Sequence, residues 1–225
     1  MSQRRHMIGP TLAAVAGRGL AVLFFVLGKV RRGRGKALHT RGELVRAQLR
    51  RRGARHIRTR VDWLDAPGVD DVLVRLSRSI GLPSPLPDVL GLAMRIAVGP
   101  DRHGDVLLAT TGTGVAGRFL LRPARDMRKT AYSSLFPYRT VTGPLLLAAF
   151  PSSAQFGQFD LAWARPTGSW VVFGTLELLD APGGASDAAV SFDPVLNVIP
   201  GLEPYDWSLQ LREFSYAAAR RSRAL

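Results

Sequence analysis

Short apolar blocks, many of them alternating with polar residues, recur along the chain after residue 36. Blocks of about four to eight residues bounded by glycine, proline or charged turns are typical of β-strands. The pattern predicts strands within 72–77, 90–99, 104–112, 116–123, 141–150, 158–166 and 169–180. Residues 37–53 add a candidate strand that passes into a polar turn.

Helical patterns are fewer. Residues 128–138 have a helix-like pattern before Pro137, residues 181–189 read as a loop, and residues 207–223 read as a helix. Three prolines exclude regular structure throughout 192–207. Seven or eight strands with few helices predict an α+β domain, built on an antiparallel β-barrel of about eight strands or a strongly curved sheet, with accessory helices.

The amino-terminal stretch 7–30 is mostly apolar, but its uninterrupted run "GLAVLFFVLG" is only half the length of about twenty residues that a membrane-spanning helix needs. A secretory signal is an alternative, although no small-x-small cleavage site follows the run. We expect a helix that packs on a partner or lies at a membrane interface; the alternative is a helix docked on its own domain. Residues 1–35 therefore form one predicted segment and 36–225 the predicted main domain.

Composition excludes several kinds of chemistry. The chain has no cysteine, which rules out disulfides, thiolate metal sites and thiol nucleophiles. The four histidines have no zinc-site spacing. The net charge of +14 is concentrated near the start, because residues 1–60 hold sixteen Lys/Arg and one acid. Such a region favours an acidic membrane surface, nucleic acid or an acidic partner, unless it is only a solvated surface.

The segment "REFSYAAARRSRAL" combines one tyrosine with several arginines. In a helix, Arg212, Tyr216, Arg220 and Arg223 fall on one stripe. The stripe is either a basic tail that complements the helix dipole or a surface that faces anions. In the second case Arg212 and Arg220 would hold Tyr216 as a phenolate. Tyrosinate is a known axial ligand of haem iron, and Arg223 would pair with a propionate.

The same segment resembles the proximal-helix signature of the haem catalases, R-x-F-[SA]-Y-x-D-T-x-x-x-R-L-G. Its matching positions are Arg212, Phe214, Ser215, Tyr216 and Arg223. Upstream, "FDPVLNVIPGL" is similar to the F-x-P-x-x-x-V-P-G-I stretch of that family.

Three further stretches agree in the same order. "KALHTRG" resembles R-V-V-H-A-K-G and places His39 on the distal histidine and Lys36 on a propionate contact. "VLVRLS" resembles V-x-V-R-F-S and places Arg75 on a propionate-binding arginine and Ser77 on the serine that orients the distal imidazole. "LPDVLGLAMRI" resembles D-x-R-G-F-A-x-K-F, and "GDVLLATTG" lies where the family has D-L-V-G-N-N.

The resemblance spans about residues 36–225 and implies haem b, with Tyr216 as the iron ligand and Lys36, Arg75, Arg212 and Arg223 around the cofactor. His39 would act as the distal acid–base group, because the pKa of histidine lies near neutrality. We therefore expect a catalase-like peroxidase that acts on hydrogen peroxide or on organic or lipid hydroperoxides. The alternative is a non-enzymatic haem carrier or sensor.

The departures from the family are also specific. The distal asparagine has no counterpart, since "LATTG" offers Ala109, Thr110 and Thr111. Thr110 and Thr111 are the candidates for a replacement hydrogen-bond donor to peroxide. Lys36 replaces an arginine, and Ala218 and Ala219 replace the Asp-Thr pair after the tyrosine. The missing asparagine favours peroxidase turnover or hydroperoxide rearrangement over fast disproportionation of hydrogen peroxide.

The expected partners are a peroxide and a small or lipid reductant. Residues 1–35 are the candidate contact with a membrane surface in an otherwise cytoplasmic protein. Nucleic acid is the weaker alternative for the basic region, and a homo-oligomer is expected by analogy with the family.

Overall fold

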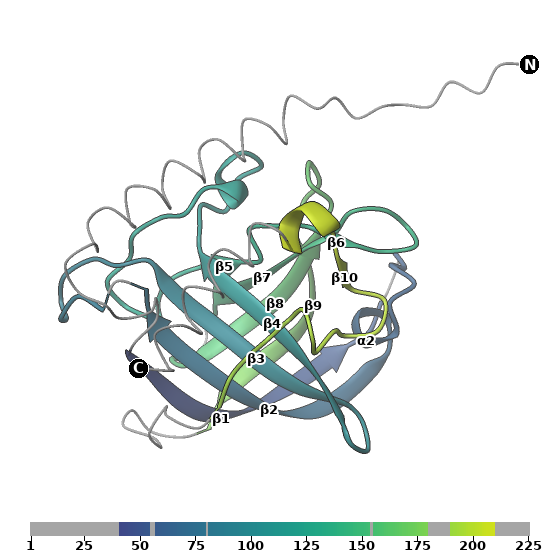
Figure 1. Ribbon diagram of the computed structural model, residues 1–225, viewed down its shortest axis with the longest axis horizontal. Coiled ribbons are helices and arrows are strands. Elements are labelled where there is room, and N and C mark those ends of the chain that lie inside the picture. Colours follow the sequence, from purple (N-terminus) through teal and green to yellow (C-terminus); the bar gives the residue numbers. More distant parts are fainter. Residues whose placement is uncertain (1–40, 55–56, 80, 154, 180–189, 210–225) are drawn as a thin grey trace, which may run out of the picture. The chain divides into compact units, whose positions relative to one another are not determined.

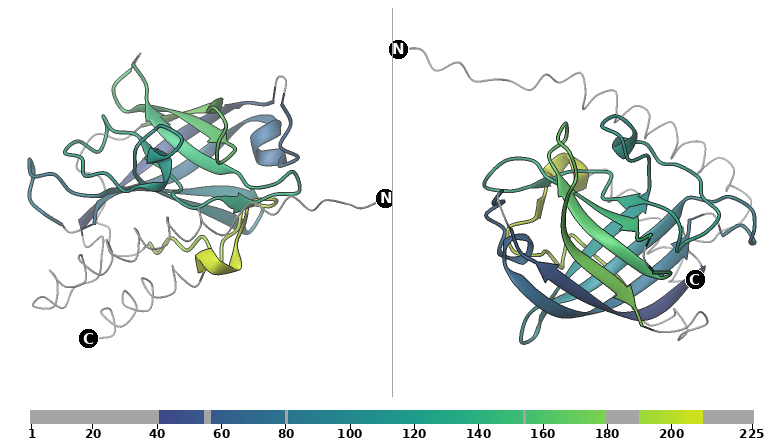
Figure 2. Two further views of the ribbon diagram at one scale, coloured as in Figure 1. Left: turned by 90° about the horizontal axis from the view of Figure 1, so that it is seen from above. Right: turned by 180° about the vertical axis from the view of Figure 1, so that it is seen from behind.

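The protein forms a closed antiparallel barrel (Figures 1 and 2). The computed structural model describes residues 41–54, 57–79, 81–153, 155–179 and 190–209. All of these lie within the predicted main domain, and the division at residue 35 stays a prediction. The strand order around the barrel is β1-β2-β3-β4-β5-β7-β8-β9, which confirms the predicted fold class.

The barrel strands are connected mainly as an up-and-down meander. Their bounds are β1 Arg41–Arg52, β2 Pro67–Arg78, β3 Leu90–Gly99, β4 Arg102–Thr110, β5 Tyr132–Ser133, β7 Leu146–Pro151, β8 Gln158–Ala164 and β9 Val171–Leu178. Outside the barrel, β6 (Tyr138–Arg139) and β10 (Glu203–Pro204) pair as a small second sheet.

Every second side chain along the strands points into the barrel, and these side chains, most of them apolar, fill its interior. In β2, Val72, Val74 and Leu76 are buried in the core, whereas Leu73 and Arg75 between them are half-buried on the outer face. Cross-strand pairing carries the same parity to β3 and β4, because directly opposed residues share a face. The core is therefore a continuous set of aliphatic and aromatic side chains that closes the lumen, as in other small barrels.

The short helix α2 (Asp62–Asp65) marks one end of the barrel, which we call the helix end (Figure 1). Trp63 of α2 is buried. Its ring lies edge-to-face against that of Phe173, and the two ring centroids are 5.2 Å apart. Arg51 fixes the backbone here: its guanidinium donates to Trp63 O and Ala66 O at 3.1 and 2.9 Å and pairs with Asp70 at 2.6 Å. Turn carbonyls that α2 cannot satisfy by itself are thus bonded by a strand side chain.

The opposite end, which we call the loop end, is formed by the loops 79–89, 111–131 and 152–157 (Figure 1). Arg78 clamps the first loop, because its guanidinium donates to the carbonyls of Leu82 and Leu86 and lies 3.9 Å from the buried carboxylate of Asp88. Arg128 pairs with Glu43 of β1 at 3.1 Å. Partly buried ion pairs therefore hold these loops on the barrel.

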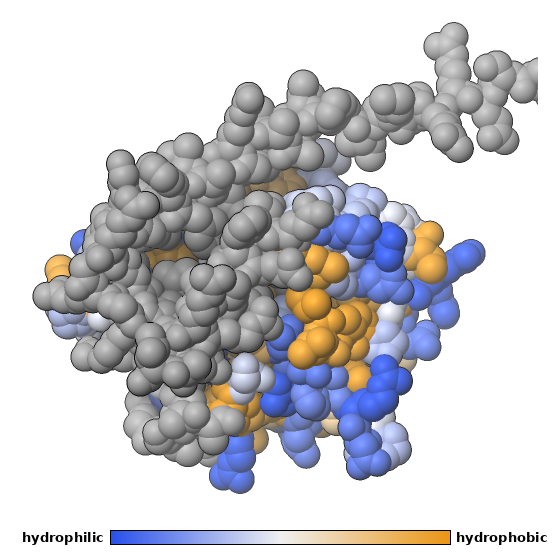
Figure 3. Space-filling view, in the orientation of Figure 1, coloured by the Kyte–Doolittle hydropathy of each residue, from blue (hydrophilic) through white to orange (hydrophobic). Residues whose placement is uncertain are grey.

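The described segment 190–209, which we call the strap, crosses the outside of β3 and β4 (Figure 1). It includes β10 and then turns into a helix at Asp206, as the amide of Leu209 donates to Tyr205 O at 3.0 Å. A helix from about Asp206 was expected, and its start is confirmed. Figure 3 shows an apolar patch over the strap, where Leu196 is 79% exposed.

Two local predictions are wrong. Residues 128–138 contain no helix but the short strands β5 and β6, and residues 116–123 hold a single 3₁₀ turn, Gly117–Phe119, in place of a strand. In the first case Tyr132 is drawn into the barrel wall, where its hydroxyl donates to Met127 O at 2.6 Å. Burial raises the pKa of the Tyr132 phenol and keeps it neutral. Tertiary pairing here overrides the local pattern.

No helix among the described residues is both long and apolar enough to cross a membrane.

Close strand packing at Gly174 predicts a sensitive position. A Cβ there would lie 2.9 Å from Arg50 O and 3.1 Å from a methyl carbon of Leu49. We expect Gly174→Ala to lower the unfolding free energy by about 2 kcal/mol, because the contact is with backbone that cannot move aside. Thermal denaturation should show a fall in Tm of about 5 °C. Gly114→Ala is the control, since no heavy atom lies within 4 Å of its Cβ position; equal Tm values for both variants would contradict the packing.

Candidate functional site

A row of small residues crosses the outer face of β1 to β4. Gly42, Ser77, Gly91 and Ala109 are successive cross-strand partners, so all four lie on the outward side of the sheet. Gly91 and Ser77 are buried although they face away from the core. The row leaves this part of the outer face low, with no side chain longer than that of serine.

A second row lies two residues further along the same strands. It consists of the successive partners Leu44, Arg75, Ala93 and Leu107. Arg75 is half-buried, and its guanidinium rests against Gly42: a Cβ on Gly42 would be 2.8 Å from both Cζ and Nε of Arg75. The glycine therefore makes room for the cation to lie against β1, beside the row of small residues.

Arg75 and Ser77 are two of the predicted site residues, and the structure brings them together. Because they are two positions apart on β2, both project from the outward face. Ser77 is paired with Gly42, which follows His39 by three residues in the sequence. His39 and Lys36 lie outside the described residues, so the predicted contact between the Ser77 hydroxyl and the His39 imidazole stays a prediction.

The predicted proximal residues Arg212, Tyr216 and Arg223 also lie outside the described part of the chain. Among the residues that are described, no group of three His, Asp or Glu side chains could hold a metal ion. The assignment of Tyr216 as an iron ligand therefore stays a prediction from the sequence.

Thr110 does not join the predicted cluster. It is buried on the inward side of β4, with the parity of Val106 and Leu108, whereas Ser77 faces outward. Its hydroxyl donates to Arg122 O at 2.6 Å and accepts from the amide of Leu90 at 3.1 Å. The single hydroxyl proton of Thr110 is therefore used in a bond that holds the chain after β4. The donor role expected for Thr110 toward peroxide finds no support in this orientation.

The outward position at this level of β4 belongs to Ala109, whose methyl group offers no hydrogen bond. Thr111, the remaining alternative, donates to the hydroxyl of Ser133 at 3.0 Å, and Ser133 donates to Arg118 O at 3.0 Å. All three residues that could have replaced the amide of the family are therefore apolar or already bonded to protein. Within the described rows, the polar side chains are Arg75 and Ser77.

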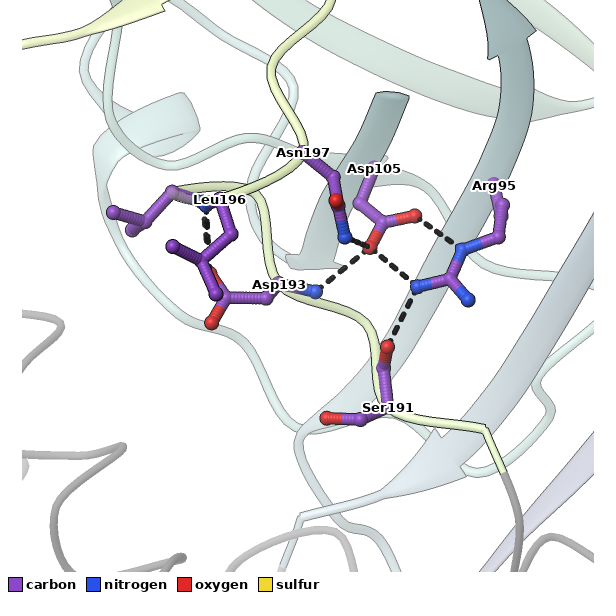
Figure 4. A network of polar contacts seen from close by, with 7 residues as sticks. Arg95, Asp105, Ser191, Asp193, Leu196 and Asn197 are labelled. Atoms are coloured by element: carbon purple, nitrogen blue, oxygen red, sulfur yellow. Dashed lines mark hydrogen bonds and ion pairs between the residues drawn. The ribbon is translucent and has the colours of Figure 1, made fainter. Parts of the chain in front are cut away.

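An ion pair that sequence reasoning missed borders these rows (Figure 4). Arg95 and Asp105 are direct partners across β3 and β4, and the guanidinium donates twice to the carboxylate, at 2.8 and 2.7 Å. Asp105 also accepts from the amide of Asp193 and from Nδ2 of Asn197, both at 2.8 Å. Arg95 in turn donates to Ser191 O at 2.6 Å. Four donors thus converge on one buried carboxylate.

The electrostatics of the pair follow from these contacts. Burial by itself would raise the pKa of the Asp105 carboxyl, but the hydrogen bonds from Arg95, Asp193 and Asn197 outweigh it, so the pKa is lowered. The hydrogen bond to Asp105 raises the pKa of Arg95. Both groups are therefore charged at neutral pH, and a charge-assisted bidentate contact holds the strap to the sheet.

The ion pair determines where the strap runs. Asp105 N donates to Asn197 O at 2.8 Å, and Phe192 lies under the Arg95 guanidinium, which is 5.0 Å from the ring centroid. The strap is fastened two positions beyond the row that contains Arg75. It then leads to Asp206, where a helix begins.

A sequence signal for this contact existed but was not decisive. Arg95 and Asp105 stand out as lone charges inside apolar strands 90–99 and 104–112, and a hairpin between these strands places charges on the same face opposite each other. The third and fourth donors come from a proline-containing segment about ninety residues later, whose course no local pattern indicates.

Comparison with known proteins supports the architecture. The sequence matches no family model and no curated protein. Among solved structures, a bacterial catalase is similar with a TM-score of 0.58 and 16% sequence identity, over 90% of this chain and 60% of the catalase chain. At this identity the likeness shows the fold alone. The barrel is therefore catalase-like, and the chain spans 60% of the length of that catalase.

The strap contact predicts a pH-dependent contribution to stability. We expect Asp105→Asn to lower the unfolding free energy at pH 7 by about 3 kcal/mol, because Arg95 is left without its charge partner. Since the pKa of Asp105 is lowered on folding, the contribution is present above about pH 4 and is lost as the pH falls below that value. Denaturant unfolding of both proteins between pH 7 and acid should show the difference shrinking. Asp101→Asn, in the exposed turn after β3, is the control and should change little.

Proposed function

We propose that this protein is a haem-dependent enzyme that metabolises peroxides, a catalase-like peroxidase acting on hydrogen peroxide or on organic or lipid hydroperoxides. The observation that carries the proposal is the placement of Arg75 and Ser77 side by side on the outward face of a catalase-like barrel, next to a row of small residues. Both residues belong to the stretch that resembles the family motif.

The described residues fit one face of a porphyrin. A flat macrocycle needs a low, mostly apolar surface, and Gly42, Gly91, Ala93 and Ala109 provide short or absent side chains on the outer face of the sheet. A haem also carries two carboxylates, for which a half-buried guanidinium such as that of Arg75 is a suitable partner. These features support haem as the group that binds at this surface.

The remaining holding residues are assigned by resemblance. Tyr216 would bind the iron as a phenolate, and Arg212 would donate to the phenolate oxygen and keep it ionised. Lys36 and Arg223 would join Arg75 around the carboxylates. The anchored strap supports this arrangement, because it carries the chain from the sheet to the helix start at Asp206, ten residues before Tyr216.

When bound, ferric haem would supply the electron exchange that breaks the O–O bond of a peroxide. The chain's own part is proton movement. The His39 imidazole would take the proton from one peroxide oxygen and return it to the other, which leaves as water or as an alcohol. Ser77 would hold the imidazole in the orientation that this transfer needs, as other hydroxyl and carboxyl groups do for functional histidines.

The distal surface favours peroxidase chemistry over fast disproportionation of hydrogen peroxide. Ala109 cannot donate to a bound peroxide, and the hydroxyls of Thr110 and Thr111 are engaged with Arg122 O and Ser133. A second molecule of hydrogen peroxide would thus find few donors to orient it. The same observation supports the second candidate, a haem carrier or sensor that binds the cofactor without appreciable peroxide turnover.

The cofactor assignment predicts a specific optical response. The protein as isolated, or after haem addition, should show a Soret band, and Tyr216→Phe should shift or abolish it because the phenolate donor is lost. Tyr205→Phe is the matched control, since Tyr205 lies in the strap, stacked on Trp207. Absence of any haem complex after reconstitution would reject the proposal.

The proton-transfer role predicts separable effects on binding and turnover. His39→Ala should retain haem yet lose peroxide-dependent oxidation of a dye by at least about a hundredfold, the usual contribution of a positioned acid–base group. Ser77→Ala should lose less. His103→Ala, on β4 at the helix end, should oxidise the dye at the unaltered rate. Haem binding with no turnover in the unaltered protein would favour the carrier or sensor.

A further inference from the structure

The large apolar side chains exposed at the loop end of the barrel include those of Phe156, Leu179 and Leu86. Phe156 is 65% exposed, Leu179 56% and Leu86 49%. They come from three separate segments: the loop before β8, the residue after β9, and the loop between β2 and β3. Exposed apolar groups of this size that gather on one part of a surface indicate an interaction site.

Contacts connect these segments to one another. Asp88, two residues after Leu86, pairs its backbone with that of Ala124, and the next loop runs on to Lys129. The ammonium group of Lys129 lies 5.7 Å from the ring centroid of Phe156. The amide of Leu178 then donates to Gly157 O at 3.1 Å, which brings Leu179 beside the same loop.

Cations border the apolar residues. Arg122, Arg125 and Lys129 are exposed in the loop 111–131. Asp126 is the exposed acid within the described loops of this end, and it is 3.9 Å from Lys129. Asp88 is buried beside Arg78, and Glu43 is paired with Arg128. The surface that reaches solvent is therefore apolar and positively charged.

The strongly basic beginning of the chain joins the barrel at this end. Residues 1–40 contain eight Lys/Arg, no acid and the apolar run "GLAVLFFVLG", and they connect directly to Arg41, where β1 starts. The sequence that precedes β1 is therefore both apolar and cationic in composition.

We propose that the loop end binds an anionic lipid bilayer, with Leu86, Phe156 and Leu179 entering the interface and Arg122, Arg125 and Lys129 contacting lipid phosphates. A second copy of this chain would bring the same cations together. An anionic bilayer interface suits both the apolar side chains and the cations of this surface. Acyl chains accept the apolar groups, and anionic head groups neutralise the cations.

The ion pairs of the loop end make the surface ready for binding. The ion pairs of Arg78 with Asp88 and of Arg128 with Glu43 fix the loops before contact, so little conformational entropy is lost on docking.

The candidate haem face includes Gly42 and Ser77, at the start of β1 and the end of β2, and so lies toward the same end. If the proposed function holds, this orientation gives a lipid hydroperoxide a short route to the site; bilayer binding itself does not depend on haem.

The absence of cysteine allows a site-specific test on the full chain. Leu86→Cys and Leu179→Cys, each labelled with a polarity-sensitive fluorophore, should show a blue shift with vesicles of phosphatidylcholine and phosphatidylserine, and none with phosphatidylcholine alone. Val141→Cys, 79% exposed in the loop after β6 at the helix end, is the matched control and should stay in water. Vesicle binding without a shift at residues 86 and 179 would assign the docking to the amino-terminal segment and overturn the proposal, as would absence of binding.

Charge reversal gives a second, independent measurement. Arg125→Glu with Lys129→Glu should weaken partitioning onto the anionic vesicles by about 25-fold or more, because each cation near the surface contributes a factor of roughly five. Arg58→Glu with Arg102→Glu changes the net charge equally on exposed residues of the helix end. Equal losses for the two double variants would mean a general effect of net charge and would contradict a localised surface. Neither measurement requires haem, so failure here leaves the peroxidase proposal to be judged by its own spectrum.

Discussion

The register of β2 in the barrel wall is the constraint on which the candidate site depends. Val72, Val74 and Leu76 must face the lumen, because the interior is closed only when every strand contributes its apolar residues. That requirement places Arg75 and Ser77 on the opposite face at the same time. A slip by one residue would bury the guanidinium in a hydrocarbon core, at a cost of several kcal/mol. Packing of the core therefore also fixes the positions of Arg75 and Ser77 on the outer face.

The ion pair between Arg95 and Asp105 extends this order beyond the barrel. It lies on the outward face of the same sheet. Hydrogen bonds to Asp193, Asn197 and the carbonyl of Ser191 hold the irregular first part of the strap on one path across β3 and β4. A proline-rich chain has little means of fixing itself, since it makes few backbone bonds of its own. The buried carboxylate takes over that role.

Sequence reasoning succeeded where a residue's environment repeats along the chain. The strands at 72–77 and 90–99 and the barrel itself follow from apolar periodicity, and the spacing of Arg75 and Ser77 already implies a common face. The same rule, applied to Thr110, would have placed it inward with Val106 and Leu108, away from Ser77. The predicted helix at 128–138 failed because a two-residue strand has no periodicity to detect, and its identity depends on distant partners.

The outer face near Ala109 has few free hydrogen-bond donors, because the fold itself uses the nearby hydroxyl groups. Thr110 and Thr111 hold the chain after β4 against the barrel through Arg122 and Ser133, so their hydroxyls serve the fold and are not free to serve a ligand. A donor at this level would have to come from the outward position, which is Ala109. Haem bound here would be flanked by His39 with little further polar assistance, an environment that accepts an apolar hydroperoxide without leaving buried polar groups unpaired. Under the proposed function, a methyl group in place of an amide would favour bulky organic substrates over a second hydrogen peroxide.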